Sequence, residues 1–69
     1  SGKNFVEYLN DLRLGYATRE LVNTNSPISE ICYNCGYNNI SNFNRIFKQR
    51  KGVTPKEFRE TYGKLRKLI

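Results

Sequence analysis

Signals for helix starts and stops divide this sequence into short segments, and they constrain its fold more than any other feature. The strongest signal lies at residues 54–57, where Thr54, Pro55 and Glu57 form a capping box with proline at the first helical position. In such a box, the hydroxyl and the carboxylate each satisfy a backbone amide that the helix leaves free. Strand-like alternation of apolar and polar residues is missing. The pattern therefore predicts an all-α fold, a small helical domain of about four helices.

The other helix boundaries follow from the same kind of signal. Asn4 is an N-cap residue with Glu7 three positions later, Pro27 suits an early helical position, and Gly36 and Gly52 suit left-handed caps. We therefore expect helices at about residues 4–23, 26–36, 40–51 and 54–62. Residues 63–69 either extend the last helix or form a tail.

The third expected helix, residues 40–51, has two chemically different faces. Projected at about 100° per residue, one side collects Ile40, Phe43, Ile46 and Phe47. The opposite side collects Ser41, Asn44, Arg45, Lys48 and Gln49. A solvated surface helix ordinarily mixes acids with bases, whereas this sequence has no acid between residues 42 and 56. We expect the apolar side to pack on the second helix and the other side to face water or a partner.

The positive charge of the chain is concentrated in its second half. Residues 1–40 hold three bases and four acids, a net charge of −1, whereas residues 41–69 hold nine bases and two acids, a net charge of +7. This distribution favours a polyanionic partner, either nucleic acid or anionic lipid. The bases share helices with core aromatic residues rather than forming a one-sided lipid anchor, and no signal peptide or long apolar run is present. We expect no membrane partner and a cytoplasmic location.

The polar side of residues 40–51 has the chemistry that reads DNA bases. Arginine recognises guanine, asparagine or glutamine recognises adenine, and serine suits either. Two helices separated by a tight turn at residues 35–38 match a helix-turn-helix, whose second helix enters the major groove. We therefore expect double-stranded DNA as the partner. The expected base-reading residues are Ile40, Ser41, Asn44 and Arg45. The expected phosphate contacts are Asn39, Asn42, Lys48, Gln49, Arg50, Lys51, Thr54 and Lys56.

A second interpretation of these helices stays open, namely a helical protein-interaction module that serves dimerisation or contacts RNA polymerase. Affinity for duplex DNA that falls with salt separates the two interpretations. Enzyme chemistry is not expected, because the chain has no histidine and its six acids are scattered. We expect no cofactor.

Cys32 and Cys35 form a C-x-x-C pair with three possible interpretations: a redox pair, half of a zinc site, or two small apolar residues in a helix. A structural zinc site needs about four ligands, and this chain has no histidine and no further cysteine. A thioredoxin-like pair expects a βαβ context, which the sequence lacks. The third interpretation is favoured, with reduced, metal-free thiols in a reducing cytoplasm.

The first expected helix carries two apolar stripes about 140° apart in projection. One stripe contains Phe5, Tyr8, Leu9, Leu12 and Tyr16. The other contains Val6, Leu14, Ala17 and Leu21. Two offset stripes suit a helix that serves two bodies. We expect the second stripe to pack on residues 28–51, and we expect exposed Phe5, Leu9, Leu12 and Tyr16 to support self-association.

Two residues of this helix lie outside the apolar pattern. Gly15 in mid-helix costs about 1 kcal/mol relative to alanine, a cost that close packing could offset. Arg13 lies between the two stripes, where it can reach a phosphate or pair with Glu20 or another acid; the pairing is favoured.

Several motifs resemble those of a known family. They are Ile28-x-x-Ile31, Gly36-Tyr37, Phe43-x-Arg45-x-Phe47-Lys48 and Gly52-x-Thr54-Pro55-x-x-Phe58-Arg59. With Tyr8-Leu9-Asn10 and Leu12-Arg13-Leu14 upstream, the chain resembles, over about residues 2–62, the C-terminal half of the DNA-binding domain of AraC/XylS-family transcription regulators. Asn42 stands where that family commonly has an aromatic residue, and Cys32 where it commonly has alanine.

The resemblance implies bacterial transcription control and a homeodomain-like arrangement of helices. It implies a linker helix at residues 1–24, a helix-turn-helix subdomain with its C-terminal helix at residues 25–62, and an extension or tail at residues 63–69. In this family, the linker helix joins two helix-turn-helix units. We expect this chain to hold the second unit, without the first unit and without an effector-binding or dimerisation domain.

Overall fold

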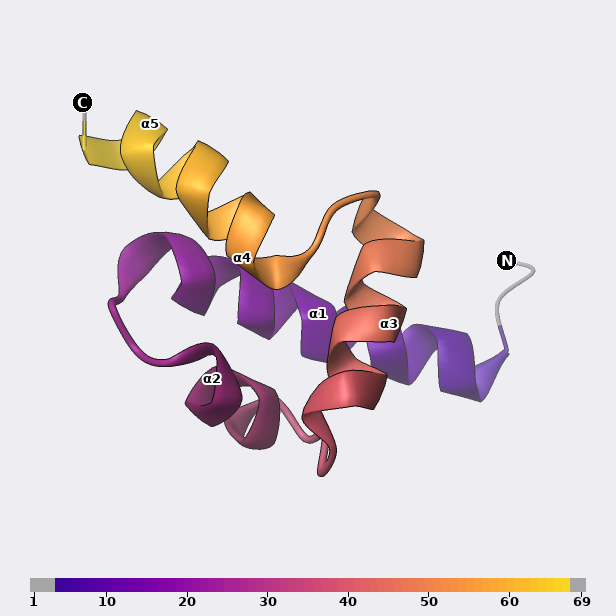
Figure 1. Ribbon diagram of the computed structural model, residues 1–69. Coiled ribbons are helices and arrows are strands. Elements are labelled where there is room, and N and C mark those ends of the chain that lie inside the picture. Colours follow the sequence, from indigo (N-terminus) through magenta and orange to yellow (C-terminus); the bar gives the residue numbers. More distant parts are fainter. Residues whose placement is uncertain (1–3, 68–69) are drawn as a thin grey trace.

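The computed structural model describes residues 4–67. Its elements, in order, are α1 (Phe5–Asn23), α2 (Ile28–Asn34), α3 (Ile40–Lys51), α4 (Pro55–Phe58), the π-helix η1 (Arg59–Gly63) and α5 (Lys64–Lys67). The last three follow one another without a break and form one C-terminal helical segment (Figure 1). The described residues contain no strand, which confirms the all-α fold class.

Local capping determines where the helices begin and end. The Asn4 side chain accepts a hydrogen bond from the backbone N–H of Glu7 at 2.9 Å and starts α1. The Asn39 side chain does the same for Asn42 at 2.8 Å and starts α3. Gly52, with φ of +84°, ends α3 in the left-handed conformation that favours glycine. These boundaries agree with the sequence-based expectation.

The capping box at residues 54–57 is fully formed. Thr54 Oγ1 accepts from the backbone N–H of Glu57 at 3.1 Å, and Glu57 Oε1 accepts from the backbone N–H of Thr54 at 2.9 Å. Hydrogen bonds from the Thr54 backbone and then from its side chain lower the pKa of the Glu57 carboxyl, because both favour the charged form. Pro55 is buried at the first position of α4, so the box fixes where the C-terminal segment leaves the turn.

A row of aromatic rings runs through the core from the turn before α3 to the C-terminal segment. Successive ring centroids lie 5.5, 5.8, 5.6 and 4.6 Å apart along Tyr37, Phe43, Phe47, Phe58 and Tyr62. Phe43 and Phe47 are completely buried. The rest of the buried apolar core is Leu14, Ala17, Leu21, Ile31, Cys32 and Cys35. Because two consecutive turns of α3 insert a ring here, the rotation of α3 about its axis is fixed.

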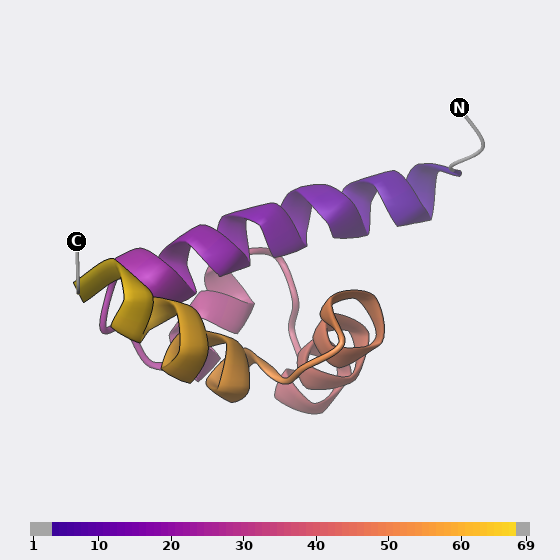
Figure 2. The same ribbon diagram turned by 90° about the horizontal axis from the view of Figure 1, so that it is seen from above.

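The N-terminal end of α1 extends beyond the other helices, whereas the rest of this helix lies against them (Figure 2). Leu14, Ala17 and Leu21 are buried, as the second apolar stripe predicts. Val6 was expected in the same contact, and this expectation is wrong, because its side chain is 64% exposed. The physical reason is length: Val6 precedes the part of α1 that the other helices cover.

The first apolar stripe of α1 divides at about Leu12. Phe5 is 75% exposed and Leu12 is 55% exposed, as expected. Leu9 is half-buried. The prediction that Tyr16 is exposed is wrong, because its side chain is partly buried and packs against the core. Gly15 also differs from expectation: a Cβ atom there would meet nothing within 4 Å, so close packing does not account for this glycine.

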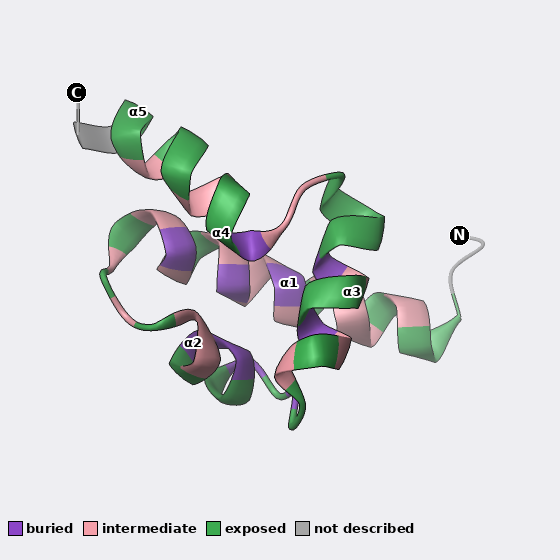
Figure 3. Ribbon diagram, viewed as in Figure 1, coloured by how far each residue is buried: buried purple, intermediate pink, exposed green. Residues whose placement is uncertain are grey.

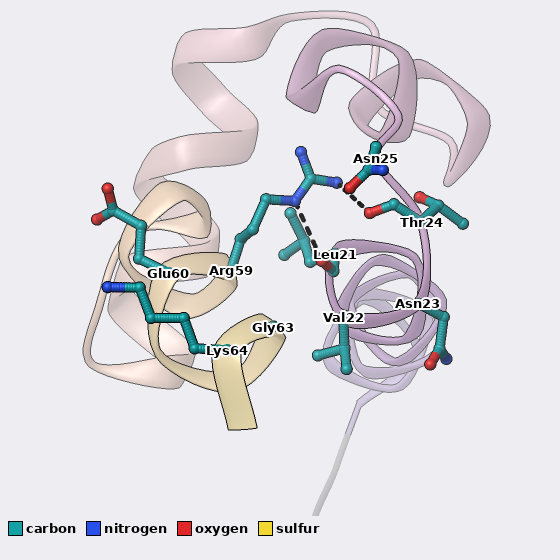
Figure 4. A pocket seen from close by; sticks show the side chains of 9 residues that line it. All are labelled: Leu21, Val22, Asn23, Thr24, Asn25, Arg59, Glu60, Gly63 and Lys64. Carbon is teal, nitrogen blue, oxygen red and sulfur yellow. Dashed lines mark hydrogen bonds between the residues drawn. The ribbon is translucent and has the colours of Figure 1, made fainter. Parts of the chain in front are cut away.

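Arg59, the first residue of η1, reaches back to the end of α1 (Figure 4). Its Nε donates to the backbone oxygen of Leu21 at 3.1 Å, and its Nη2 donates to that of Thr24 at 3.3 Å. The last carbonyls of a helix have no partner within the helix, and cations are favoured beside them. A cleft of about 340 Å³ opens beside this contact, between the end of α1 and the C-terminal segment. Arg59 therefore joins the C-terminal segment to α1 through a contact with Leu21, which lies 38 residues earlier in the sequence.

Among the described residues, no helix has both the length and the apolar character that crossing a membrane requires.

Candidate nucleic-acid interface

Much of α3 is exposed (Figure 3), and its outward side carries residues with hydroxyl, amide and cationic groups. Since Phe43 and Phe47 are buried on the inner side, the opposite side must face away from the core. The exposed residues of this outward side are Ser41, Asn44, Arg45, Lys48 and Gln49, which the helical projection predicted. Lys51 is also exposed, at the end of the helix, but it projects about 120° from Arg45, and its assignment came from its charge. No carboxylate belongs to α3.

Arg45, at the centre of this side, is oriented by a neighbour. Its Nη2 donates to Oδ1 of Asn42, three residues earlier and on the same side of the helix. Asn42 is half-buried, and its own backbone N–H is held by Asn39. Sequence reasoning assigned Asn42 to a phosphate and missed this contact, although the spacing of three residues was a usable signal.

The N-terminal end of α3 holds two of the expected contact residues in structural roles. The Asn39 side-chain oxygen caps the helix, so its amide N–H₂ group is the part left for a partner. Ile40 is half-buried and packs against the core. Only part of its side chain is therefore available to touch a base, which is less than the sequence suggested.

Cations and a hydroxyl flank the turn between α3 and α4. Lys48 and Lys51 lie in the last turn of α3, and Lys56 is exposed in the first turn of α4. The hydroxyl of Thr54 accepts its capping bond, and a hydrogen bond from the same side chain lowers the pKa of the Glu57 carboxyl, so Thr54 is already engaged with Glu57. A backbone phosphate needs donors and positive charge of this kind.

Arg50 is positioned differently from the other cations of α3. Its Nη1 lies 2.7 Å from Oδ1 of Asp11 in the middle of α1, and the two side chains are 27% and 33% exposed. At about 100° per residue, Arg50 projects about 140° from Arg45 and only about 20° from Phe43. The angle follows from the residue numbers alone, so the inward direction of Arg50 was predictable. The prediction that it contacts a phosphate rested on its charge. The structure places Arg50 against α1 rather than among the outward cations.

Arg13 does not form the ion pair with Glu20 that the sequence suggested. Its guanidinium lies over the Tyr37 ring, 5.4 Å from the ring centroid, and it borders Gly36. The Tyr37 hydroxyl in turn donates to Oδ1 of Asn10. A cation over an aromatic face is attracted by the ring quadrupole. Residues of α1 thus hold the turn that precedes the outward helix.

Cys32 and Cys35 are buried free thiols beneath this turn. Burial, followed by the charge of Cys32, raises the pKa of Cys35 from 9.0 to about 11. Burial also raises the pKa of Cys32. The thiolate is the reactive form of cysteine, so both groups are poor nucleophiles at neutral pH. Among the described residues, no group of three or more His, Cys, Asp and Glu side chains is placed to hold a metal ion.

Comparison with known proteins agrees with this geometry. A family model described as a helix-turn-helix domain matches residues 1–61. The transcriptional activator RhaR of Cronobacter sakazakii is 34% identical over 65 residues, which cover 94% of this chain and 23% of that protein. The ornithine utilization regulator of Pseudomonas aeruginosa is 36% identical over 59 residues, which cover 86% of this chain and 17% of that protein.

A third relative carries a second activity in its name. The bifunctional transcriptional activator and DNA repair enzyme AdaA of Bacillus subtilis is 36% identical over 59 residues, which cover 86% of this chain and 28% of that protein. The chain thus spans between 17% and 28% of the length of these three proteins. No solved structure matches it. With its helix-turn-helix fold and these relatives, the chain belongs to the AraC/XylS family of transcription regulators.

Proposed function

We propose that this chain binds double-stranded DNA sequence-specifically, as part of a bacterial transcription regulator, with α3 in the major groove. The observation that carries the proposal is the outward side of α3, which is free of acids and is fixed in rotation by the buried Phe43 and Phe47. A helix held in this way can present the same side chains to base edges in every complex.

Arg45 is the main base-reading residue in this proposal, with Asn44 and Ser41 reading neighbouring base pairs. Arginine donates to guanine O6 and N7 together, which is the commonest specific contact in the major groove. The hydrogen bond from Arg45 to Asn42 restricts the guanidinium before binding, so less conformational freedom is lost when a base is contacted. Ile40 contributes at most an edge contact with a thymine methyl group.

The phosphate contacts proposed are those of Lys48, Gln49, Lys51 and Lys56, with the amide N–H₂ group of Asn39 beside them. Thr54 would join them by exchanging its side-chain contact with Glu57 for a phosphate. Asn42 acts mainly through Arg45. These contacts supply affinity and register but carry no sequence information. Three lysines that neutralise three phosphates give a log–log salt slope of about −3.

Catalysis forms no part of the proposal. The buried thiols have raised pKa values, and the part of the chain that the structure describes has no group of three or more His, Cys, Asp and Glu side chains placed to hold a metal ion. A contact with RNA polymerase or another protein is the alternative role, and no described feature favours it over DNA.

The experiment begins with a random pool of duplexes, from which this chain selects its preferred sequence. Binding of the selected duplex and of a scrambled duplex is then measured by fluorescence anisotropy at several salt concentrations. Arg45→Ala should lose about 1–3 kcal/mol on the selected duplex and relax the preference at one base pair. Lys48→Ala should weaken both duplexes evenly and reduce the salt slope by about 1.

Two results would count against the proposal in different ways. Equal losses on both duplexes for Arg45→Ala would make this arginine a backbone contact and would move the reading side elsewhere. Binding that is absent, or that ignores salt, would favour the protein-interaction alternative.

A further inference from the structure

We propose that Asp11 sets the DNA affinity of this chain by holding Arg50 away from the phosphate backbone. The inference rests on the proposed DNA-binding function. It concerns a residue of α1 that touches no base or phosphate in that proposal, so Asp11 acts as a positioning residue through Arg50.

The contact between the two residues is close and joins two different helices. Arg50 Nη1 donates to Asp11 Oδ1 at 2.7 Å, across 39 residues of sequence. A hydrogen bond between a guanidinium and a carboxylate carries charge on both partners and is stronger than a neutral one. About a third of the Asp11 side chain remains exposed, so the pair lies at the surface, where a phosphate could compete for the same guanidinium.

The direction of the Arg50 side chain supports this role. Arg50 projects about 140° around α3 from Arg45, which is at the centre of the proposed reading side. Lys48 projects only about 60° from Arg45 and is exposed. To contact a phosphate on the reading side, Arg50 must leave Asp11. Lys48 is already exposed on that side, where its charge contributes to lowering the pKa of Glu57 in α4. Arg50 is therefore a cation of α3 that the fold withholds from DNA.

As a consequence, fewer cations of α3 contact phosphates than its sequence contains, because Arg50 is not among them. Each phosphate that a protein cation neutralises adds about 0.9 to the magnitude of the log–log salt slope. If Asp11 keeps Arg50, then Arg50 adds nothing to that slope in the unaltered chain. Removing the Asp11 charge should release Arg50 and add one phosphate contact.

The test is a double-mutant cycle on the salt slope, measured with the selected duplex described above. Asp11→Asn should steepen the slope by about 0.9, so that raising the salt from 50 to 200 mM weakens binding about 3.5-fold more than in the unaltered chain. Arg50→Gln alone should leave the slope unchanged. The double variant should return to the unaltered slope, because no Arg50 remains to be released.

Two matched controls separate this effect from general changes of charge. Glu7→Gln removes an acid one helical turn before Asp11 and should leave the slope unchanged. Lys48→Gln removes a cation of α3 and should flatten the slope by about 0.9. Asp11→Glu keeps the carboxylate and should restore the unaltered slope. Circular dichroism melting confirms that each variant is folded.

Specific results would overturn the inference. If Arg50→Gln flattens the slope as much as Lys48→Gln does, Arg50 already contacts a phosphate and Asp11 withholds nothing. If Asp11→Asn and Glu7→Gln have equal effects, the change is one of net charge alone. Arg50→Gln can still overturn the inference if Asp11→Asn does not fold. A chain without salt-dependent DNA binding would instead refute the proposed function.

Discussion

Two glycines in this chain differ in how much room a side chain would have. The difference can be tested by replacing each glycine with alanine. Gly36 has φ of +108°, and a Cβ atom there would lie 2.7 Å from Nε of Arg13. Gly15 lies within α1, and its Cβ atom would meet nothing within 4 Å. The first glycine is therefore required by conformation and by a neighbour, whereas the second is required by nothing that the described residues show.

We expect Gly36→Ala to lower the free energy of unfolding by about 1–3 kcal/mol, because a non-glycine residue at this φ is strained. The side chain of Arg13 must also shift from its place over Tyr37. Gly15→Ala should raise the free energy of unfolding by about 1 kcal/mol through helix propensity. Urea denaturation of both variants measures the two effects with opposite signs. An unchanged stability in Gly36→Ala would show that the turn relaxes without loss.

Among the helices, the contact between the C-terminal segment and α1 depends on Arg59. It is the side chain shown to donate to the carbonyls of both Leu21 and Thr24. Arg59→Met keeps much of the side-chain length but removes both hydrogen bonds. We expect a loss of about 1.5–3 kcal/mol in the free energy of unfolding, since hydrogen bonds from charged donors have this magnitude.

Arg19 provides the matched control for Arg59, because it is exposed on the same helix that Arg59 caps. Arg19→Met should change stability by no more than about 0.5 kcal/mol. Amide hydrogen exchange should report faster opening of the last turn of α1 in Arg59→Met and not in the control. Equal losses in the two variants would assign the effect to net charge rather than to capping.

The helix boundaries were predictable from sequence because capping is local. Asn4, Asn39, Gly52 and the box at residues 54–57 each act on backbone groups within four positions. The C-terminal segment is the exception. Its sequence predicted an ordinary helix, whereas residues 59–63 form a π-helix. The π-helix begins at Arg59, the residue whose side chain contacts α1. This contact cannot be predicted from the neighbouring residues in the sequence.

The partners of the long side chains were the least predictable part of the site. Arg13, Arg50 and Arg59 each bind a group that lies more than 20 residues away. A long cationic side chain reaches several neighbours, and the fold decides which of them it meets. The outward positions of Arg45 and Lys48 were easier to predict, because helical periodicity and the buried rings of Phe43 and Phe47 determine them.

The assembled fold leaves apolar side chains exposed on the N-terminal half of α1. The end of this half extends beyond the other helices (Figure 2). Phe5, Tyr8 and Leu12 are each more than half exposed. Contiguous exposed apolar residues tend to find partners. We expect concentration-dependent self-association through this surface, most simply as a two-fold dimer. Sedimentation equilibrium should detect it, and Leu12→Ser should weaken it.

Tyr33 offers a matched control for this surface, because it is 54% exposed on α2, close to the 55% of Leu12. Tyr33→Ser should leave self-association unchanged. A chain that stays monomeric at high concentration would show that the exposed residues of α1 do not pair with one another. Equal effects of both variants would point to unspecific association through apolar surface.

The ion pair between Asp11 and Arg50 opens and closes at a rate that can be compared with the rates of DNA binding and release. Exposed side chains change rotamer within picoseconds to nanoseconds, whereas a protein meets and leaves DNA far more slowly. The pair at the surface therefore opens and closes many times during a single encounter. It cannot act as a gate that delays binding. A change at Asp11 alters both the field that DNA meets on approach and the contacts of the finished complex, so the association rate and the lifetime on DNA would both record it.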